Sequence, residues 1–125
     1  MSFEQYSVVV IPFPFADRAA ARRRPAVVVS TPETLGGRVG HSVLAMITSA
    51  GNPPWPFDVG VADLGAAGLP QPSVVRMKLF TLDNRLVIRV AGKLAPADAE
   101  GVEQAIQAII RRRDVTSAIP EPQSR

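Results

Sequence analysis

The chain has 125 residues, with 14 Lys and Arg against 11 Asp and Glu, a net charge of +3 and no cysteine. This length suits one domain with one core, and a hydrophobic content of 46% excludes a disordered chain. The missing thiols exclude disulfides and thiolate metal sites, while the basic balance favours an anionic partner without establishing one.

Two features of the sequence bear on where in the cell the protein is expected. Residues 1–5 lack a basic start followed by an apolar run, so no signal peptide is expected. No apolar stretch approaches the roughly 20 residues that cross a bilayer. We therefore expect no membrane contact, a cytoplasmic location, a single domain over residues 1–114 and a flexible polar tail over 115–125.

Short β-branched and apolar runs predict six strands, at residues 7–11, 25–30, 42–49, 56–61, 73–78 and 86–90. Pro12 cannot donate to a strand ladder, so the first strand is expected to end there or to lie at an edge. Three connecting segments are expected between strands: a basic loop at 16–24, a glycine-rich connector at 31–40 and a loop at 65–72.

Only the end of the chain has a clear helical pattern. Pro96 suits a first helical position, Asp98 lies in the first turn, and arginines 111–113 are expected in the last turn. One apolar stripe is expected to pack on the sheet: Val102, Ile106, Ile109 and Ile110. Short strands followed by one helix favour an α+β fold that is mainly β, a small antiparallel sheet or barrel capped by a helix.

The most informative stretch is Arg22–Ser30, in which three arginines precede Pro25 and a short strand. Like charges at a strand end repel one another, whereas guanidinium groups bind phosphate well. A rigid strand behind them would hold one arginine in place, so a phosphodiester is the first ligand to consider. From the charge run alone, a solvated loop that aids solubility is the favoured alternative.

Five motifs follow one another along the chain: Val8–Phe15, Arg23–Ser30, Ile47–Ser49 with Pro56–Val59, Ser73–Asp83, and Gly92–Leu94 before the last helix. In this order and spacing they resemble the MazF/PemK family of toxin endoribonucleases. Two positions depart from the family pattern. Tyr6-Ser7 stands where the family usually has Gly-Asp, and Lys78 stands where some members have an aspartate that is proposed as a base.

The resemblance implies a small SH3-like antiparallel barrel of the CcdB/PemK type with a C-terminal helix. It also implies a homodimer and a cognate antitoxin whose disordered tail lies across the RNA groove. The implied activity is sequence-specific cleavage of single-stranded RNA without metal or other cofactor, leaving 2′,3′-cyclic phosphate and 5′-hydroxyl ends. By motif match, the catalytic residues would be Arg24 and Thr48.

Binding of RNA needs further phosphate contacts and stacking surfaces. The candidates are Arg22, Arg23, Ser49, Trp55, Phe57, Arg76 and Lys78. Each has a structural alternative. Thr48-Ser49 can simply end a strand, Trp55 and Phe57 can be core residues, Arg76 can form a cross-strand ion pair, and Lys78 can be a solubilising edge charge. The general base stays open, since the single histidine, His41, is expected in a surface loop.

Two other functions stay open. A toxin of the same fold can act by poisoning DNA gyrase, as CcdB-like proteins do, and fold alone does not separate the two activities. A non-catalytic RNA-binding or regulatory protein is the second alternative, motivated by Lys78 and by Tyr6-Ser7.

Overall fold

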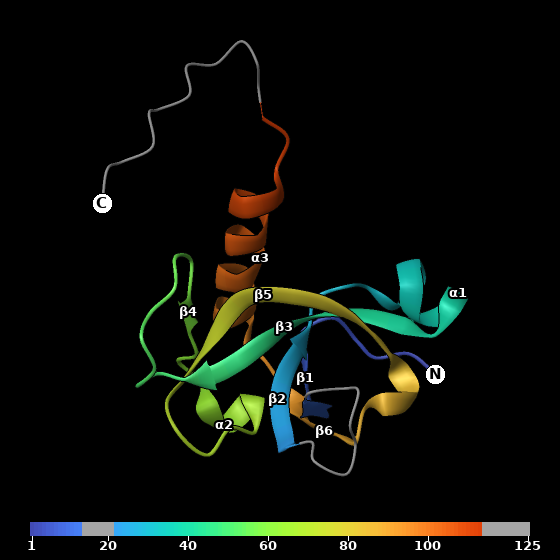
Figure 1. The fold of residues 1–125 in the computed structure, drawn as a ribbon, viewed down its shortest axis with the longest axis horizontal. Coiled ribbons are helices and arrows are strands. Elements are labelled where there is room, and N and C mark those ends of the chain that lie inside the picture. The colour runs from blue at the N-terminus through green and yellow to red at the C-terminus, as the bar shows by residue number, and fades with distance from the viewer. Residues whose placement is uncertain (14–21, 114–125) are drawn as a thin grey trace.

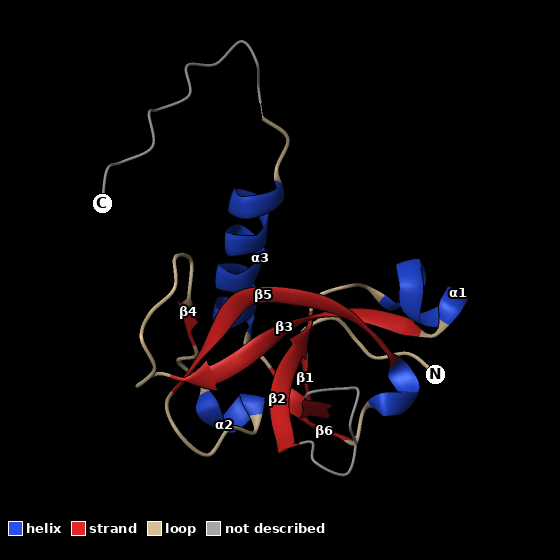
Figure 2. Cartoon of the chain, in the orientation of Figure 1, coloured by secondary structure: helices blue, strands red, loops and turns tan. Residues whose placement is uncertain are grey.

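Six antiparallel strands form one curled sheet in this computed structural model, which describes residues 1–13 and 22–113 (Figures 1 and 2). The strands are β1 Ser7–Phe13, β2 Arg22–Val28, β3 His41–Ser49, β4 Val59–Gly60, β5 Ser73–Asp83 and β6 Arg89–Lys93. Their order across the sheet is β4-β5-β3-β2-β1-β6, so the described strands leave β4 and β6 at two separate edges. The predicted α+β, mainly β architecture is confirmed, with the sheet curled into a half-barrel.

The sheet buries side chains on both faces, because successive residues of a strand point to opposite sides. Val8, Val27 and Ala45 belong to one core cluster, which also contains Val102. Their neighbours along the strands, such as Val9, Ala26 and Leu44, belong to a second cluster, against which Phe13 and Phe80 pack. The continuous apolar runs of the sequence are therefore explained by strands with two covered faces.

The helix α3, Pro96–Ile110, covers the first of these faces (Figure 1). Two of its own residues, Val102 and Ala105, are buried against the sheet, as the sequence pattern predicted for Val102. The predicted apolar stripe is wrong at its far end, where Ile109 and Ile110 are 40% and 62% exposed because the helix extends past the sheet. Arginines 111–113 follow the helix and do not form its last turn.

Three strand predictions need correction in the first half of the chain. β1 continues through Pro12 to Phe13, because Pro12 lies beyond the last β1 residue paired with β6, Val10, and so breaks no bond of that ladder. Arginines 22–24, expected in a loop, lie in β2 opposite residues 11–13, and β2 ends at Val28. The remaining residues of the expected basic loop, 16–21, lie outside the described residues, as does the expected tail at 115–125.

Further corrections concern the second half. The strand expected at 56–61 is only Val59–Gly60, since Phe57 adopts a positive φ of 66° that extended strands do not use. β5 runs on to Asp83, and a short 3₁₀ helix at Asn84–Leu86 displaces the last strand to β6. The Asp83 carboxylate starts that turn by accepting a hydrogen bond from the Arg85 N–H.

Short helices replace two predicted loops. The connector at 31–40 contains a π-helical turn, Pro32–Gly36, followed by α1, Gly37–Val39. The loop at 65–72 is preceded and partly replaced by α2, Leu64–Ala67, whose N-terminus is capped by Asp63. α2 lies so close to β6 that a Cβ atom at Gly92 would collide with the Ala66 carbonyl, which explains the glycine in the fifth motif.

Candidate active site

A pocket of about 220 Å³ opens on the face of the sheet opposite α3. Arg24 lies two residues before Ala26, and Thr48 two residues after Met46, so both share the face of the second core cluster. The loop after β3 completes the pocket. Its lining residues are Phe13, Arg24, Met46, Ile47, Thr48, Asn52, Trp55, Arg76 and Lys78.

Strand register brings Arg24 and Thr48 to the same place. β2 and β3 pair from Val28 opposite Leu44 to Ala26 opposite Met46, so Arg24 and Thr48 each lie two residues beyond the last pair, and both line the pocket. Arg24 is exposed, and within the described residues no ion pair or hydrogen bond engages its guanidinium group. Its charge is therefore available to an anionic ligand in the pocket.

The Thr48 hydroxyl has a neighbour from the following turn. Asn52 Nδ2 donates a hydrogen bond to Thr48 Oγ1 over 2.6 Å, and both side chains line the pocket. The turn itself is closed by a backbone hydrogen bond from the Asn52 N–H to the Ser49 carbonyl, 3.1 Å long. The sequence prediction missed Asn52; the Gly51-Asn52-Pro53-Pro54 run predicted a break in the chain but not where an amide would point.

Arg76 also lines the pocket, but its guanidinium group is already occupied. Nε and Nη2 donate to the two Asp58 carboxylate oxygens over 3.2 and 3.0 Å, and Nη2 also donates to the Pro53 carbonyl over 2.8 Å. The Trp55 ring lies 5.0 Å from the guanidinium carbon, within the range of a cation–π contact. Arg76 therefore holds the 53–58 loop and the Trp55 side chain in place through these contacts.

The Arg76–Asp58 pair is largely shielded from water, with exposed side-chain fractions of 12% and 13%. The hydrogen bond from Arg76 holds the pKa of the Asp58 carboxyl below its usual value, and the same bond raises the pKa of Arg76. Because the folded-state pKa of Asp58 is lowered, the pair stabilises the loop at pH values above the ordinary pKa of an Asp carboxyl. This stabilisation is lost as the pH falls through the lowered pKa.

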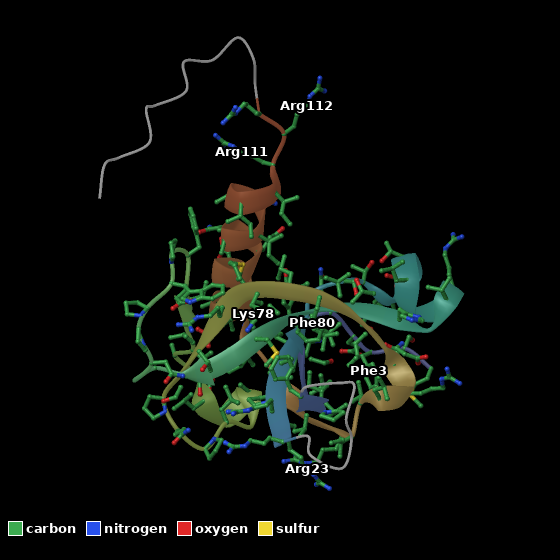
Figure 3. The ribbon with its side chains drawn as sticks, in the orientation of Figure 1. Phe3, Arg23, Lys78, Phe80, Arg111 and Arg112 are labelled. Atoms are coloured by element: carbon green, nitrogen blue, oxygen red, sulfur yellow. The ribbon has the colours of Figure 1, made fainter. Side chains whose placement is uncertain are left out.

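The remaining candidates divide into two groups. Lys78 lines the pocket, with Nζ 5.6 Å from the Phe13 ring centre, and Figure 3 shows it on β5 beside Phe80. Four predicted binding residues are exposed but do not line it: Arg22, Arg23, Ser49 and Phe57. In Figure 3, Arg23 lies near the start of β2, at the end of the strand that points away from the centre of the sheet.

The core alternative is wrong for Trp55 and Phe57, which are 45% and 53% exposed. The ion pair considered for Arg76 is present: its partner, Asp58, directly precedes β4, where Val59 pairs with Val75 of β5. No Asp, Glu or His is among the described lining residues, and His41 lies at the start of β3, the end far from Thr48.

In the described ranges, no three His, Cys, Asp or Glu side chains group as metal ligands would. Nor is any helix there long and apolar enough to cross a membrane.

Solved structures of toxins share this fold. MazF in a MazE–MazF complex from Deinococcus radiodurans superposes with a TM-score of 0.69 at 21% identity, covering 88% of this chain and 97% of that one. The Mycobacterium tuberculosis toxin MazF-mt6 gives 0.64 at 19% identity, covering 82% and 93%. An endoribonuclease bound to its cognate antitoxin from a mycobacterial species gives 0.64 at 15% identity, covering 86% and 91%.

The family is settled by sequence. A profile of the PemK-like, MazF-like toxins of type II toxin–antitoxin systems matches residues 4–110. This chain therefore belongs to that toxin family. No curated protein sequence matches the chain.

Proposed function

We propose that this toxin is a sequence-specific endoribonuclease that cleaves single-stranded RNA without a metal ion. The observation that carries the proposal is the placement in one pocket of the Thr48 hydroxyl and the Arg24 guanidinium group, which has no ion-pair partner among the residues that the structure describes. Family membership supports the same activity. Lys78 and Trp55, which line the pocket beside them, supply a further charge and a stacking surface for the RNA chain.

RNA carries its own nucleophile, so the protein has three tasks. The 2′-oxygen attacks phosphorus, the bond from phosphorus to the 5′-oxygen breaks, and the products are a 2′,3′-cyclic phosphate and a 5′-hydroxyl. The 2′-hydroxyl loses one proton and the leaving oxygen gains one. The protein must align the two oxygens, stabilise the extra charge on phosphorus and manage these protons.

Arg24 suits the second task, because its planar fork can clamp two non-bridging oxygens and stays charged at any physiological pH. Thr48 adds a hydrogen bond to the same phosphate. Arg24 is a poor base, so its work is electrostatic, with acid assistance to the leaving oxygen. Among the described lining residues there is no carboxylate or imidazole that could take the 2′-hydroxyl proton.

The experiment is incubation of the pure chain with a long single-stranded RNA in EDTA, followed by sequencing of the new ends. We expect cuts at a short recurring sequence with 5′-hydroxyl ends. Arg24→Ala should lower the rate roughly 10²–10³-fold with an unchanged fold, since it removes a preorganised charge from the transition state. Full activity of Arg24→Ala would refute the mechanism.

Two alternatives remain as outcomes. Inhibition of gyrase supercoiling without RNA cleavage would favour the CcdB-like activity, and salt-sensitive RNA binding without products would favour a non-catalytic protein. We also propose a homodimer and a cognate antitoxin as partners, since solved relatives of this fold include complexes with MazE.

A further inference from the structure

A threonine hydroxyl can donate only one hydrogen bond, and its direction is set by what the oxygen accepts. In this structure Thr48 Oγ1 accepts a hydrogen bond from Asn52 Nδ2 at 2.6 Å. One lone pair is thereby occupied, and the hydroxyl proton is left for another partner. Because Thr48 and Arg24 line the same pocket, a phosphate bound by Arg24 would share that pocket with this hydroxyl proton.

The amide is itself held in place. The Asn52 N–H bonds to the Ser49 carbonyl at 3.1 Å, and the Gly51 N–H bonds to Ser49 Oγ at 3.3 Å. The next residue, Pro53, has its carbonyl bound by Arg76 at 2.8 Å. The turn that carries Asn52 is thus anchored on both sides, to β3 and to β5.

We propose that Asn52 is a positioning residue, which holds the Thr48 hydroxyl as an acceptor so that its proton points to the scissile phosphate. The inference rests on the nuclease function proposed above and adds a residue to it. Donation into Oγ1 also polarises the O–H bond, since hydrogen bonds in a chain strengthen one another. Asn52 acts through Thr48 and takes no proton in the reaction.

The test is a double-mutant cycle on RNA cleavage, measured in single turnover with the protein in saturating excess. Asn52→Ala should lower the rate constant about 10-fold, the size of one well-placed hydrogen bond. In the Thr48→Ala background the same change should cost less than about 2-fold, because no hydroxyl remains to orient. In Thr48→Ser, which keeps the hydroxyl, the loss should return.

Two controls accompany the cycle. Gln104→Ala removes another exposed amide, from α3 on the far face of the sheet, and should leave the rate unchanged. Affinity for a 2′-deoxy analogue of the RNA, which lacks the nucleophile, should change less than about 2-fold in Asn52→Ala, because the loss lies in the reaction step rather than in binding.

Each outcome decides a different claim. If the wild-type chain cleaves no RNA, the proposed function fails and the role of Asn52 fails with it. If the wild type cleaves and Asn52→Ala is equally fast, only the positioning role is refuted. If Asn52→Ala costs as much in Thr48→Ala as in the wild type, or weakens binding of the analogue 10-fold, Asn52 contacts the RNA itself and the inference is wrong.

Discussion

Two arginines in one pocket have different tasks because their surroundings differ. Arg24 projects from β2 without an ion-pair partner among the described residues, so an incoming phosphate finds an unshared charge. Arg76 shares its charge with Asp58 and donates a further hydrogen bond to Pro53. A guanidinium group that is paired and shielded offers little net field to a ligand, so Arg76 is better understood as the anchor of Trp55 than as a phosphate contact.

Salt dependence can separate these tasks residue by residue. For single strands, the slope of log affinity against log salt changes by about 0.7 for each phosphate that the protein no longer neutralises. We expect Lys78→Ala to reduce the slope by this amount. Arg76→Gln should weaken binding by releasing the Trp55 loop but leave the slope unchanged, and Arg38→Ala, on α1, should change neither. The measurement is binding of a 2′-deoxy RNA analogue over a salt series.

If Arg76 contacts the RNA backbone, as the sequence analysis predicted, Arg76→Gln should instead reduce the salt slope. If Arg76→Gln and Lys78→Ala reduce the slope equally, that prediction holds and the anchoring role is wrong.

At the scale of elements, the Asp98 carboxylate links α3 to the segment between β4 and α2. Asp98, in the first turn of α3, is buried and accepts hydrogen bonds from the N–H groups of Ala62 and Asp63 at 3.0 to 3.1 Å. The sequence suggested only a favourable interaction with the helix dipole. The structure shows that the same side chain also fixes the segment between β4 and α2.

Asp98→Ala should therefore lower the free energy of unfolding by about 1–3 kcal/mol, since it leaves two partly buried N–H groups without their acceptor. Urea unfolding followed by circular dichroism measures the loss. Glu100→Ala, an exposed acid on the same helix, should cost less than about 0.5 kcal/mol. Equal stability of the two variants would contradict the role assigned to Asp98.

At the scale of the molecule, several large apolar side chains stay exposed at the edge strand and at the end of α3. Val90 is 51% exposed and Ile110 is 62% exposed. A second copy of the chain would reduce such exposure, in line with the homodimer that we propose. We expect light scattering to give twice the chain mass of 13.3 kDa over a range of dilute concentrations. A constant mass of one chain would refute the dimer.

The sequence predicted the architecture and one half of the pocket, for a physical reason. Thr48 lies on a strand that the sequence predicted, where alternation determines the face on which a side chain emerges, whereas Arg24 was expected in a loop and was proposed by motif match. The other half comes from a proline-rich turn, whose shape depends on side-chain bonds such as Arg76–Asp58 and Asn52–Thr48. The Arg76–Asp58 bond joins residues 18 positions apart, whose proximity depends on strand register, and the Asn52–Thr48 bond depends on the conformation of the turn, so no sequence motif predicted either bond.

The stacking of Trp55 on Arg76 at the rim of the pocket has a practical consequence, because this chain contains a single tryptophan. Its intrinsic fluorescence therefore comes from one known position, 45% exposed, next to the pocket. An oligonucleotide base or an antitoxin segment that covers the indole will change the intensity or wavelength of this emission. Occupancy of the pocket can thus be titrated on the unlabelled, unmodified protein.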